Sequence, residues 1–309
     1  MFDRAAIIYL YVETPLHAGS GTSLGIVDLP IQRERTTGYP IVQASGLKGC
    51  LRDAVSNMKP QKVELVFGPD TQRASEHAGA ISVGDARILL FPVRSLSGVF
   101  AWVTSKDVLA RFRRDAQMAG VSLNWTETGP ETDGEALVSS KKALVKDDCI
   151  VLEEFSFKAK EHTTAKEIAE WLAQNALPAC EEYDYWRKAL PQRLVILPEN
   201  AFRDFTLFST EVVSRIRLDD ETKTVARGAL WSEEHLPSDT LLYALLFASK
   251  PRANSPPSDL QDAASVLKFV TDRIDGKRLQ LGGDATVGRG FVKVRISEGS
   301  HGAVASKNP

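Results

Sequence analysis

Residues 5–12 read Ala-Ala-Ile-Ile-Tyr-Leu-Tyr-Val, and this run decides the fold. Its β-branched and aromatic residues predict a buried strand, which ends before Thr14 and Pro15. The run is too short to span a bilayer, and no small-residue cleavage site follows it. We therefore expect neither a signal peptide nor a transmembrane helix, and no membrane partner.

The composition is that of an ordinary globular protein. The chain has 309 residues, of which 43% are hydrophobic and 25% charged, so it can form one elaborated domain or two small ones. Its net charge of −2 excludes a protein that coats nucleic acid by bulk charge. The three cysteines form no C-x-x-C pair, which argues against a disulfide framework and favours a reducing, cytoplasmic location. Any nucleic-acid site must be local.

Helix-like and strand-like segments alternate beyond the first strand. The predicted elements are a helix over 45–55 with Ser45 as N-cap, strands over 81–93 and 99–104, a helix over 106–118 capped by Ser105, a mixed block over about 120–235, an apolar run over 240–248, a helix to Ile274 behind a capping box of Ser258 and Gln261, and a strand over 291–296. Strands at both ends with helices between them predict an α+β sandwich of ferredoxin-like type, in which the middle block is the main insertion.

A long loop rich in glycine and proline separates the first strand from the first helix, and loops of this length are usually functional or mobile. It contains His17 and the sequence Val27-Asp28-Leu29-Pro30. A carboxylate here can hold a divalent cation or orient a ribose 2′-hydroxyl, and a nearby histidine can transfer a proton. The pattern alone favours the alternative, a turn-capping Asp28 and a histidine with ordinary polar partners.

A second loop, over 281–294, contains Gly282, Gly283, Gly288 and Gly290. A strand rather than a helix follows these glycines, which excludes the nucleotide-binding motifs that seat phosphate on a helix N-terminus. Seven Lys or Arg against three Asp lie between 268 and 295, so the turn with its flanking Arg289 and Lys293 suits a phosphodiester chain. The alternative is a tight hairpin with a solvated basic face.

Residues 215–228 form two alternating segments around an acidic turn, which predicts a protruding β-hairpin. Its Arg215 and Arg217 can lie beside single-stranded RNA, although a solvated hairpin is the simpler reading of the segment alone. Farther along, Glu233 and Glu234 can contribute acids to a site, but adjacent glutamates normally mark a solvated surface.

Taken in order, these motifs resemble the RAMP superfamily of CRISPR proteins, and most closely the repeated backbone subunit of the type III-B Cmr effector complex. The motifs are His-x-Gly-x-Gly at 17–21, Val-Asp-Leu-Pro at 27–30, Ser-Gly-Leu-Lys-Gly-x-Leu-Arg at 45–52, Val-Phe-Ala-Trp-Val-Thr at 99–104, Asp-Asp-Glu-Thr-Lys at 219–223, Glu-Glu-x-Leu-Pro at 233–237 and the glycine turn at 282–290. The resemblance spans Leu10 to Val294.

The resemblance implies a fold and a partner set. It implies an RRM-like palm with large inserted fingers and a protruding thumb hairpin, in a single RAMP domain over 1–309. The palm core would cover about 1–118 and 237–297, the fingers and thumb about 119–236, and a flexible tail 298–309. Copies of such a subunit stack with other Cmr subunits into a filament along a CRISPR guide RNA. Sequence is then read by base pairing with complementary target RNA.

The resemblance also implies an activity, the cleavage of target RNA through its 2′-hydroxyl with a divalent metal, Mg²⁺ or Mn²⁺, held jointly with the RNA. Asp28 takes the role of the essential acid and metal ligand, and His17, Glu233 and Glu234 match the catalytic positions less firmly. The expected RNA contacts are Ser45, Lys48, Arg52, Arg215, Arg217, Gly282, Gly283, Gly288, Arg289 and Lys293. Three alternatives stay open: a non-catalytic guide-binding scaffold, a guide-processing endonuclease, and a small-molecule enzyme, which would need a compact apolar pocket.

Overall fold

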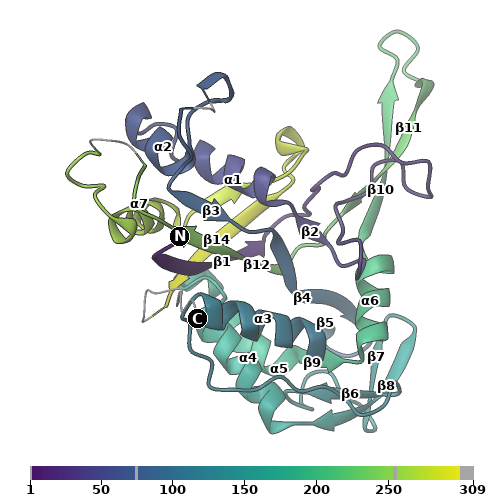
Figure 1. Cartoon of the computed structure of the whole chain (residues 1–309). Coiled ribbons are helices and arrows are strands. Elements are labelled where there is room, and N and C mark those ends of the chain that lie inside the picture. Colours follow the sequence, from purple (N-terminus) through teal and green to yellow (C-terminus); the bar gives the residue numbers. More distant parts are fainter. Residues whose placement is uncertain (1, 74–75, 253–255, 300–309) are drawn as a thin grey trace.

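The computed structural model describes residues 2–73, 76–252 and 256–299 (Figure 1). Its strands are β1 (Arg4–Val12), β2 (Ile41–Val42), β3 (Ile81–Val83), β4 (Ala86–Ser95), β5 (Val99–Ser105), β6 (Glu135–Val138), β7 (Cys149–Leu152), β8 (Phe155–Glu161), β9 (Leu194–Leu197), β10 (Glu211–Leu218), β11 (Val225–His235), β12 (Leu241–Ala248), β13 (Arg278–Gln280) and β14 (Phe291–Glu298). Its α-helices are α1 (Ala44–Asp53), α2 (Pro60–Phe67), α3 (Lys106–Met118), α4 (Thr163–Asn175), α5 (Asp184–Arg193), α6 (Glu199–Phe208) and α7 (Ala263–Ile274). Short 3₁₀ turns lie at Thr71–Arg73, Glu181–Tyr183 and Ala285–Val287.

Strand β1 is the centre of the first half of the molecule. Residues 5–12 are all buried, as their apolar sequence predicts, and they pair antiparallel with β12 on one side and β14 on the other. The sheet continues in the order β13-β14-β1-β12-β4. Helix α7 joins β12 to the β13–β14 pair and packs against β1, β12 and β14, while α1 packs against β3 and β13. The expected α+β class is confirmed.

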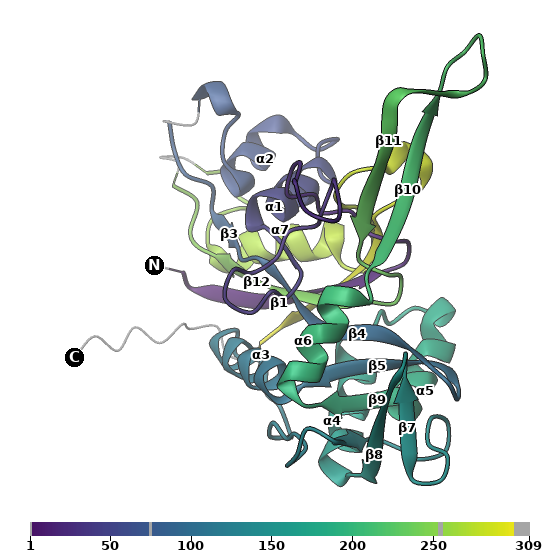
Figure 2. The same ribbon diagram turned by 90° about the vertical axis from the view of Figure 1, so that its right-hand side faces the viewer.

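The middle block extends this sheet rather than standing outside it. From β4 the strand order continues as β5-β9-β6-β8-β7, and β7 pairs back to β4 through Leu152 and Ser95. Figures 1 and 2 show this second lobe below the first, with α3, α4, α5 and α6 around its strands. Strand β5 and helix α3, which the sequence placed in the palm core, lie in this second lobe because β5 pairs with β9 of the middle block.

Strands β10 and β11 form a separate two-stranded sheet. This predicted hairpin is confirmed, and it projects beyond the first lobe (Figure 2). Its strands are longer than the alternating pattern at 215–228 indicated, because Glu211 already pairs with His235. The base of the hairpin is buried on one strand while its tip is exposed, so the tip gains no stability from a core.

Two predicted helix caps are wrong. Helix α1 begins one residue earlier, at Ala44, whose N–H donates to Asp85 Oδ1 at 2.8 Å, so Ser45 lies inside the helix. The capping box of α7 is formed by Asp262 and Ser265 rather than by Ser258 and Gln261. The Gln261 amide instead donates to the carbonyls of Pro256 and Pro257 and so belongs to the turn before the helix.

Strand β14 runs to Glu298, so that residue belongs to the sheet and not to the predicted tail. The remainder of that predicted tail from residue 300 onward lies outside the described residues. Within the three described ranges, no helix has both the length and the apolar character needed to cross a membrane.

Candidate functional site

The loop between β1 and β2 runs along the base of the hairpin. Leu16 forms an isolated antiparallel bridge with Leu236, and Leu29 forms a parallel bridge with Glu233. Between these two bridges the loop carries Asp28 out to solvent while its ends stay attached to the hairpin strand. Residues more than 200 positions apart in the sequence thereby form one site.

The Asp28 side chain is exposed but held in place by Ser232 of β11. Its Oδ2 accepts the Ser232 backbone N–H at 2.7 Å and the Ser232 hydroxyl at 2.8 Å. These hydrogen bonds to the charged form hold the pKa of Asp28 below its ordinary value. Its second oxygen, Oδ1, accepts no hydrogen bond from any residue that the structure describes. Asp28 is therefore an ionised carboxylate with one oxygen free for a cation or a hydroxyl.

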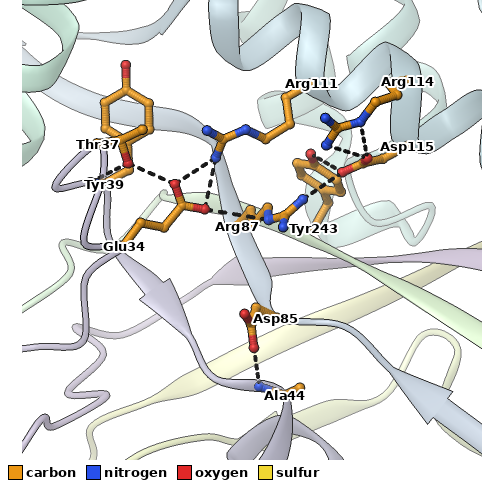
Figure 3. A network of polar contacts seen from close by, with 10 residues as sticks. All are labelled: Glu34, Thr37, Tyr39, Ala44, Asp85, Arg87, Arg111, Arg114, Asp115 and Tyr243. Atoms are coloured by element: carbon orange, nitrogen blue, oxygen red, sulfur yellow. Dashed lines mark hydrogen bonds and ion pairs between the residues drawn. The ribbon is translucent and has the colours of Figure 1, made fainter.

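A polar network fixes the far end of the same loop (Figure 3). Arg111 of α3 donates to both carboxylate oxygens of Glu34 at 2.9 and 2.8 Å, and Arg87 of β4 lies 3.5 Å from Glu34. Arg87 also donates to the buried Asp115 at 3.1 Å, which accepts the Tyr243 hydroxyl at 2.9 Å. The loop is thus tied to both lobes, which limits the freedom of the segment that carries Asp28.

His17 is half-buried at the start of this loop. Its Nδ1 lies 2.7 Å from the Glu234 carbonyl oxygen, so Nδ1 carries the hydrogen and donates it. Nε2 is then the nitrogen that can accept a proton, and it lies beside Gly19, where an added Cβ would come within 2.7 Å. The His17 carbonyl accepts the Gly283 N–H at 2.9 Å, which brings the glycine turn to the same site.

Glu233 and Glu234 are both buried, so the reading of this pair as solvated surface is wrong. Glu233 accepts the Trp231 indole N–H and the Arg215 Nε–H, each at 2.8 Å. Burial raises the pKa of Glu233, but these two hydrogen bonds and the Arg215 charge outweigh it, and the pKa lies below its ordinary value.

Glu234 points to the other face of β11 and ties the loop to the hairpin. Its carboxylate pairs with Arg33 and accepts the Thr210 hydroxyl at 2.8 Å and the Ile31 N–H at 3.0 Å. Both carboxylate oxygens are used in these contacts, Oε1 by Arg33 and Thr210 and Oε2 by the Ile31 N–H. The Glu234 carboxylate therefore holds the loop at Ile31 and Arg33.

Two further acid–base groups, which the sequence analysis did not select, lie beside Glu233. His235 Nε2 is 3.9 Å from Glu233 Oε2 and 3.5 Å from Asp284 Oδ2, and Arg215 Nη2 is 3.8 Å from Asp284. The rings of His17 and His235 are 5.4 Å apart. The sequence offered one signal for this group, because Glu233 and His235 are two residues apart on a strand and so share one face. No local pattern indicates that Asp284 lies opposite them.

Helix α1 presents an open face with two glycines. Ser45, Gly46 and Gly49 are exposed, and a Cβ added at either glycine would meet nothing within 4 Å. Lys48 is half-buried, and burial followed by the nearby Arg52 charge holds its pKa below its ordinary value. Arg52 Nη1 donates to the carbonyls of Gly68 and Pro69 at 2.8 and 3.2 Å, so part of this side chain is used inside the fold.

The glycine turn lies next to this helix, since the Cys50 thiol donates to the Gln280 carbonyl at 3.1 Å. A Cβ on Gly282 would come within 2.3 Å of the His17 carbonyl oxygen, and Gly282 has φ +83°, so only glycine fits there. Gly288 faces open space, and Arg289 is half-buried.

Three expected RNA contacts are placed very differently from one another. Lys293 is only 8% exposed within β14, which argues against a direct phosphate contact. Arg215 is engaged by Glu233, whereas Arg217 is exposed on β10. The structure thus attaches Asp28 and His17 to neighbouring positions of β11, through Ser232 and Glu234, and places the glycine turn against His17. Arg217 lies farther out on the hairpin.

Comparison with known proteins gives consistent results. The family model of the RAMP superfamily matches residues 9–293. The chain is 44% identical over 300 residues to the CRISPR system Cmr endoribonuclease Cmr4 of Pyrococcus furiosus, with 96% of each chain covered. It is 26% identical over 306 residues to the CRISPR system CMR subunit Cmr4 of Saccharolobus solfataricus, covering 93% of this chain and 94% of the relative.

Solved structures show the same likeness. The crystal structure of oligomeric Cmr4 from Pyrococcus furiosus superposes with a TM-score of 0.73 at 35% identity, covering 96% of this chain and 98% of that one. A chain in the cryo-EM structure of the type III-B Cmr-beta complex bound to cognate target RNA gives a TM-score of 0.70 at 22% identity, over 96% of this chain and 98% of that one. The second likeness concerns the fold alone.

Proposed function

The chain belongs to the RAMP superfamily, and on this premise we propose that it is the repeated backbone subunit of a type III-B Cmr complex. In this proposal it binds CRISPR guide RNA, stacks with copies of itself and with other Cmr subunits in the cytoplasm, and cleaves complementary target RNA. The observation that carries the cleavage is the exposed, ionised Asp28 carboxylate that Ser232 holds with one oxygen free.

The fold supports an assignment of palm, fingers and thumb. The order β14-β1-β12-β4, with α1 and α7 as the connecting helices, is the order expected of a ferredoxin-like palm. The β10–β11 hairpin is then the thumb, and the second lobe contributes the fingers. Asp28 lies where the palm loop meets the base of the thumb, which is the place where both would grip one RNA strand.

The open face of α1 supports guide binding. A glycine inside a helix costs about 1 kcal/mol relative to alanine, and no residue of the described chain fills the space beside Gly46 or Gly49. A helix that keeps such glycines leaves room for a backbone from outside. Ser45 and Lys48 on the same helix, with Gly288 and Arg289 of the neighbouring turn, would bind the guide phosphates at this approach.

Asp28 also fits a divalent cation held jointly with RNA. Mg²⁺ is typically bound by one or two carboxylates together with substrate phosphates, and Asp28 offers one free oxygen at the surface. Such an ion, Mg²⁺ or Mn²⁺, would neutralise charge on the scissile phosphate. No second carboxylate of the described residues joins Asp28 in a three-ligand group, so RNA and water would complete the shell.

The residues around Asp28 supply the proton transfer. His17 Nε2 can take the proton of the 2′-hydroxyl, because Nδ1 is committed to the Glu234 carbonyl. The 2′-oxygen then forms a bond to phosphorus, and the bond from phosphorus to the 5′-oxygen breaks. The leaving 5′-oxygen takes a proton from a water molecule, and a 2′,3′-cyclic phosphate remains on the other fragment.

The reconstituted complex with guide RNA tests this function. A labelled complementary target should be cut at regular spacing with Mg²⁺ or Mn²⁺ and left intact with EDTA, while a non-complementary target should survive in both. Guide occupancy with no cutting would support the non-catalytic scaffold. Shortening of a CRISPR precursor RNA by the chain alone would support the guide-processing endonuclease.

A further inference from the structure

A second group of possible metal ligands lies beneath the Asp28 loop. Glu233 and His235 are two residues apart on β11 and so share one face of the strand, and Asp284 faces them from the glycine turn. One ligand atom from each of the three lies within 4.8 Å of the other two. His235 Nε2 is 3.5 Å from Asp284 Oδ2 and 3.9 Å from Glu233 Oε2.

His235 lacks the partners that a buried imidazole needs. Its side chain is 0% exposed, and neither ring nitrogen has a hydrogen-bond partner within the described part of the chain. A buried polar group without a hydrogen bond is costly, and native proteins rarely leave one unexplained. The imidazole lies with Nε2 towards both carboxylates, so a partner for Nε2 belongs between these three side chains.

We propose that Glu233, His235 and Asp284 bind one divalent transition-metal ion, separate from any cation at Asp28. One imidazole nitrogen and two carboxylate oxygens are a common donor set for Zn²⁺ and Mn²⁺. Ligand distances near 2.1 Å place tetrahedral donor atoms about 3.4 Å apart. The separations of His235 from Asp284 and Glu233, 3.5 and 3.9 Å, lie close to this value, and all three ligand atoms lie within 4.8 Å of one another. The Asp28 site, by contrast, offers only oxygen.

Neighbouring side chains hold the Glu233 carboxylate in place. Trp231 and Arg215 donate to the two oxygens of Glu233, as hydrogen-bonded partners commonly do around metal-binding carboxylates. Arg215 lies within 4 Å of both carboxylates, and the Arg289 charge also acts on His235, so the arrangement of the donor atoms rather than a net negative charge favours the ion. The bound ion would join the base of the hairpin to the glycine turn.

Metal titration of the full chain without RNA tests the site. Chain stripped with a chelator and loaded with Zn²⁺ or Co²⁺ should retain one ion after gel filtration, with a raised melting temperature and, for Co²⁺, a visible absorption band. Hydrogen exchange of the amides at 211–218 and 230–235 should slow on loading. Less than half an ion retained per chain would overturn the proposal.

Substitutions of the proposed ligands test where the ion binds. Asp284→Asn should weaken binding at least tenfold, and asparagine keeps the left-handed backbone at φ +61°. His235→Gln should do the same, and if it does not fold, Asp284→Asn decides the question, because its side chain is 28% exposed and its fold tolerates the change. Asp220→Asn on the exposed hairpin tip is the matched control and should bind as wild type.

Asp28→Ala separates this site from the proposed function. It should retain the ion even where RNA cleavage is lost, since Asp28 supplies no ligand here. Equal binding by Asp284→Asn and wild type, or loss of the ion in Asp28→Ala, would contradict the site.

Discussion

Asp28 and Ser232 are joined by three hydrogen bonds across 204 positions of sequence. Asp28 Oδ2 accepts from the Ser232 N–H and hydroxyl, and the Asp28 N–H donates to the Ser232 hydroxyl at 3.0 Å. The loop carboxylate is therefore positioned by the hairpin strand. Any movement of the hairpin on RNA binding would be transmitted directly to Asp28.

Ser232→Ala should impair cleavage without impairing guide binding. The change removes two of the three hydrogen bonds, so Asp28 loses its orientation and its pKa rises towards the ordinary value. We expect the rate of single-turnover target cleavage to fall about tenfold. A tenfold change in rate corresponds to roughly the free energy of one hydrogen bond to a charged group. Ser214→Ala, on the residue paired with Ser232 across the hairpin, is the control and should cleave normally. Equal rates for both variants would show that the contact does not matter.

Gly46→Ala together with Gly49→Ala should stabilise the chain and weaken guide binding. Alanine adds about 1 kcal/mol of helix stability at each position, and the structure has room for both methyl groups. The same methyl groups would obstruct a phosphodiester backbone on α1. Thermal unfolding and guide-RNA affinity measured on the same samples test both effects.

Gly134→Ala is the control for this pair. A Cβ added at Gly134 also meets no atom within 4 Å, and residue 134 lies in the second lobe, away from α1. It should leave guide affinity unchanged. Stabilisation of the double variant with unaltered guide affinity would remove α1 from the RNA path.

Guide affinity should fall at alkaline pH through Lys48. Burial and the Arg52 charge lower the pKa of Lys48 in the free chain, whereas a bound phosphate favours the charged ammonium. Binding therefore takes up a proton, and affinity declines as pH rises through the lowered pKa. Lys48→Arg, which stays charged, should show a smaller decline between pH 8 and pH 10. Parallel curves for the two proteins would exclude a phosphate contact at Lys48.

The regular elements could be predicted from the sequence because their signals are local. Apolar runs and helical spacing located β1 and α3 almost to the residue, and the apolar run over 240–248 is the segment that forms β12. The middle block was harder, since short strands such as β6 and β9 are recognisable only through the partners that they pair with. The α7 cap was missed because two capping patterns stand close together and aspartate and serine are about equal as N-caps, so the local sequence does not show that the helix begins only after Asp262.

The residues of the candidate site also divide into those with a local sequence signal and those without one. Asp28 and His17 were selected because their loop is long and its motif resembles a family. The burial of Glu233, Glu234 and Lys293 could not be read from the sequence, because it depends on strands that pair across long separations. Asp284 was missed for the same reason, since only the folded turn brings it to His235.

Target cleavage by the reconstituted complex with Asp28→Ala tests the central claim most directly. Guide occupancy is measured on the same preparation, and Asp3→Ala serves as the control, because Asp3 is an exposed aspartate before the other end of β1. We predict that regularly spaced cuts fall at least about 100-fold in Asp28→Ala, the usual scale for losing a group that takes part in the reaction, while guide occupancy and Asp3→Ala match wild type. Undiminished cuts in Asp28→Ala with full guide occupancy would contradict the account and place the nuclease elsewhere.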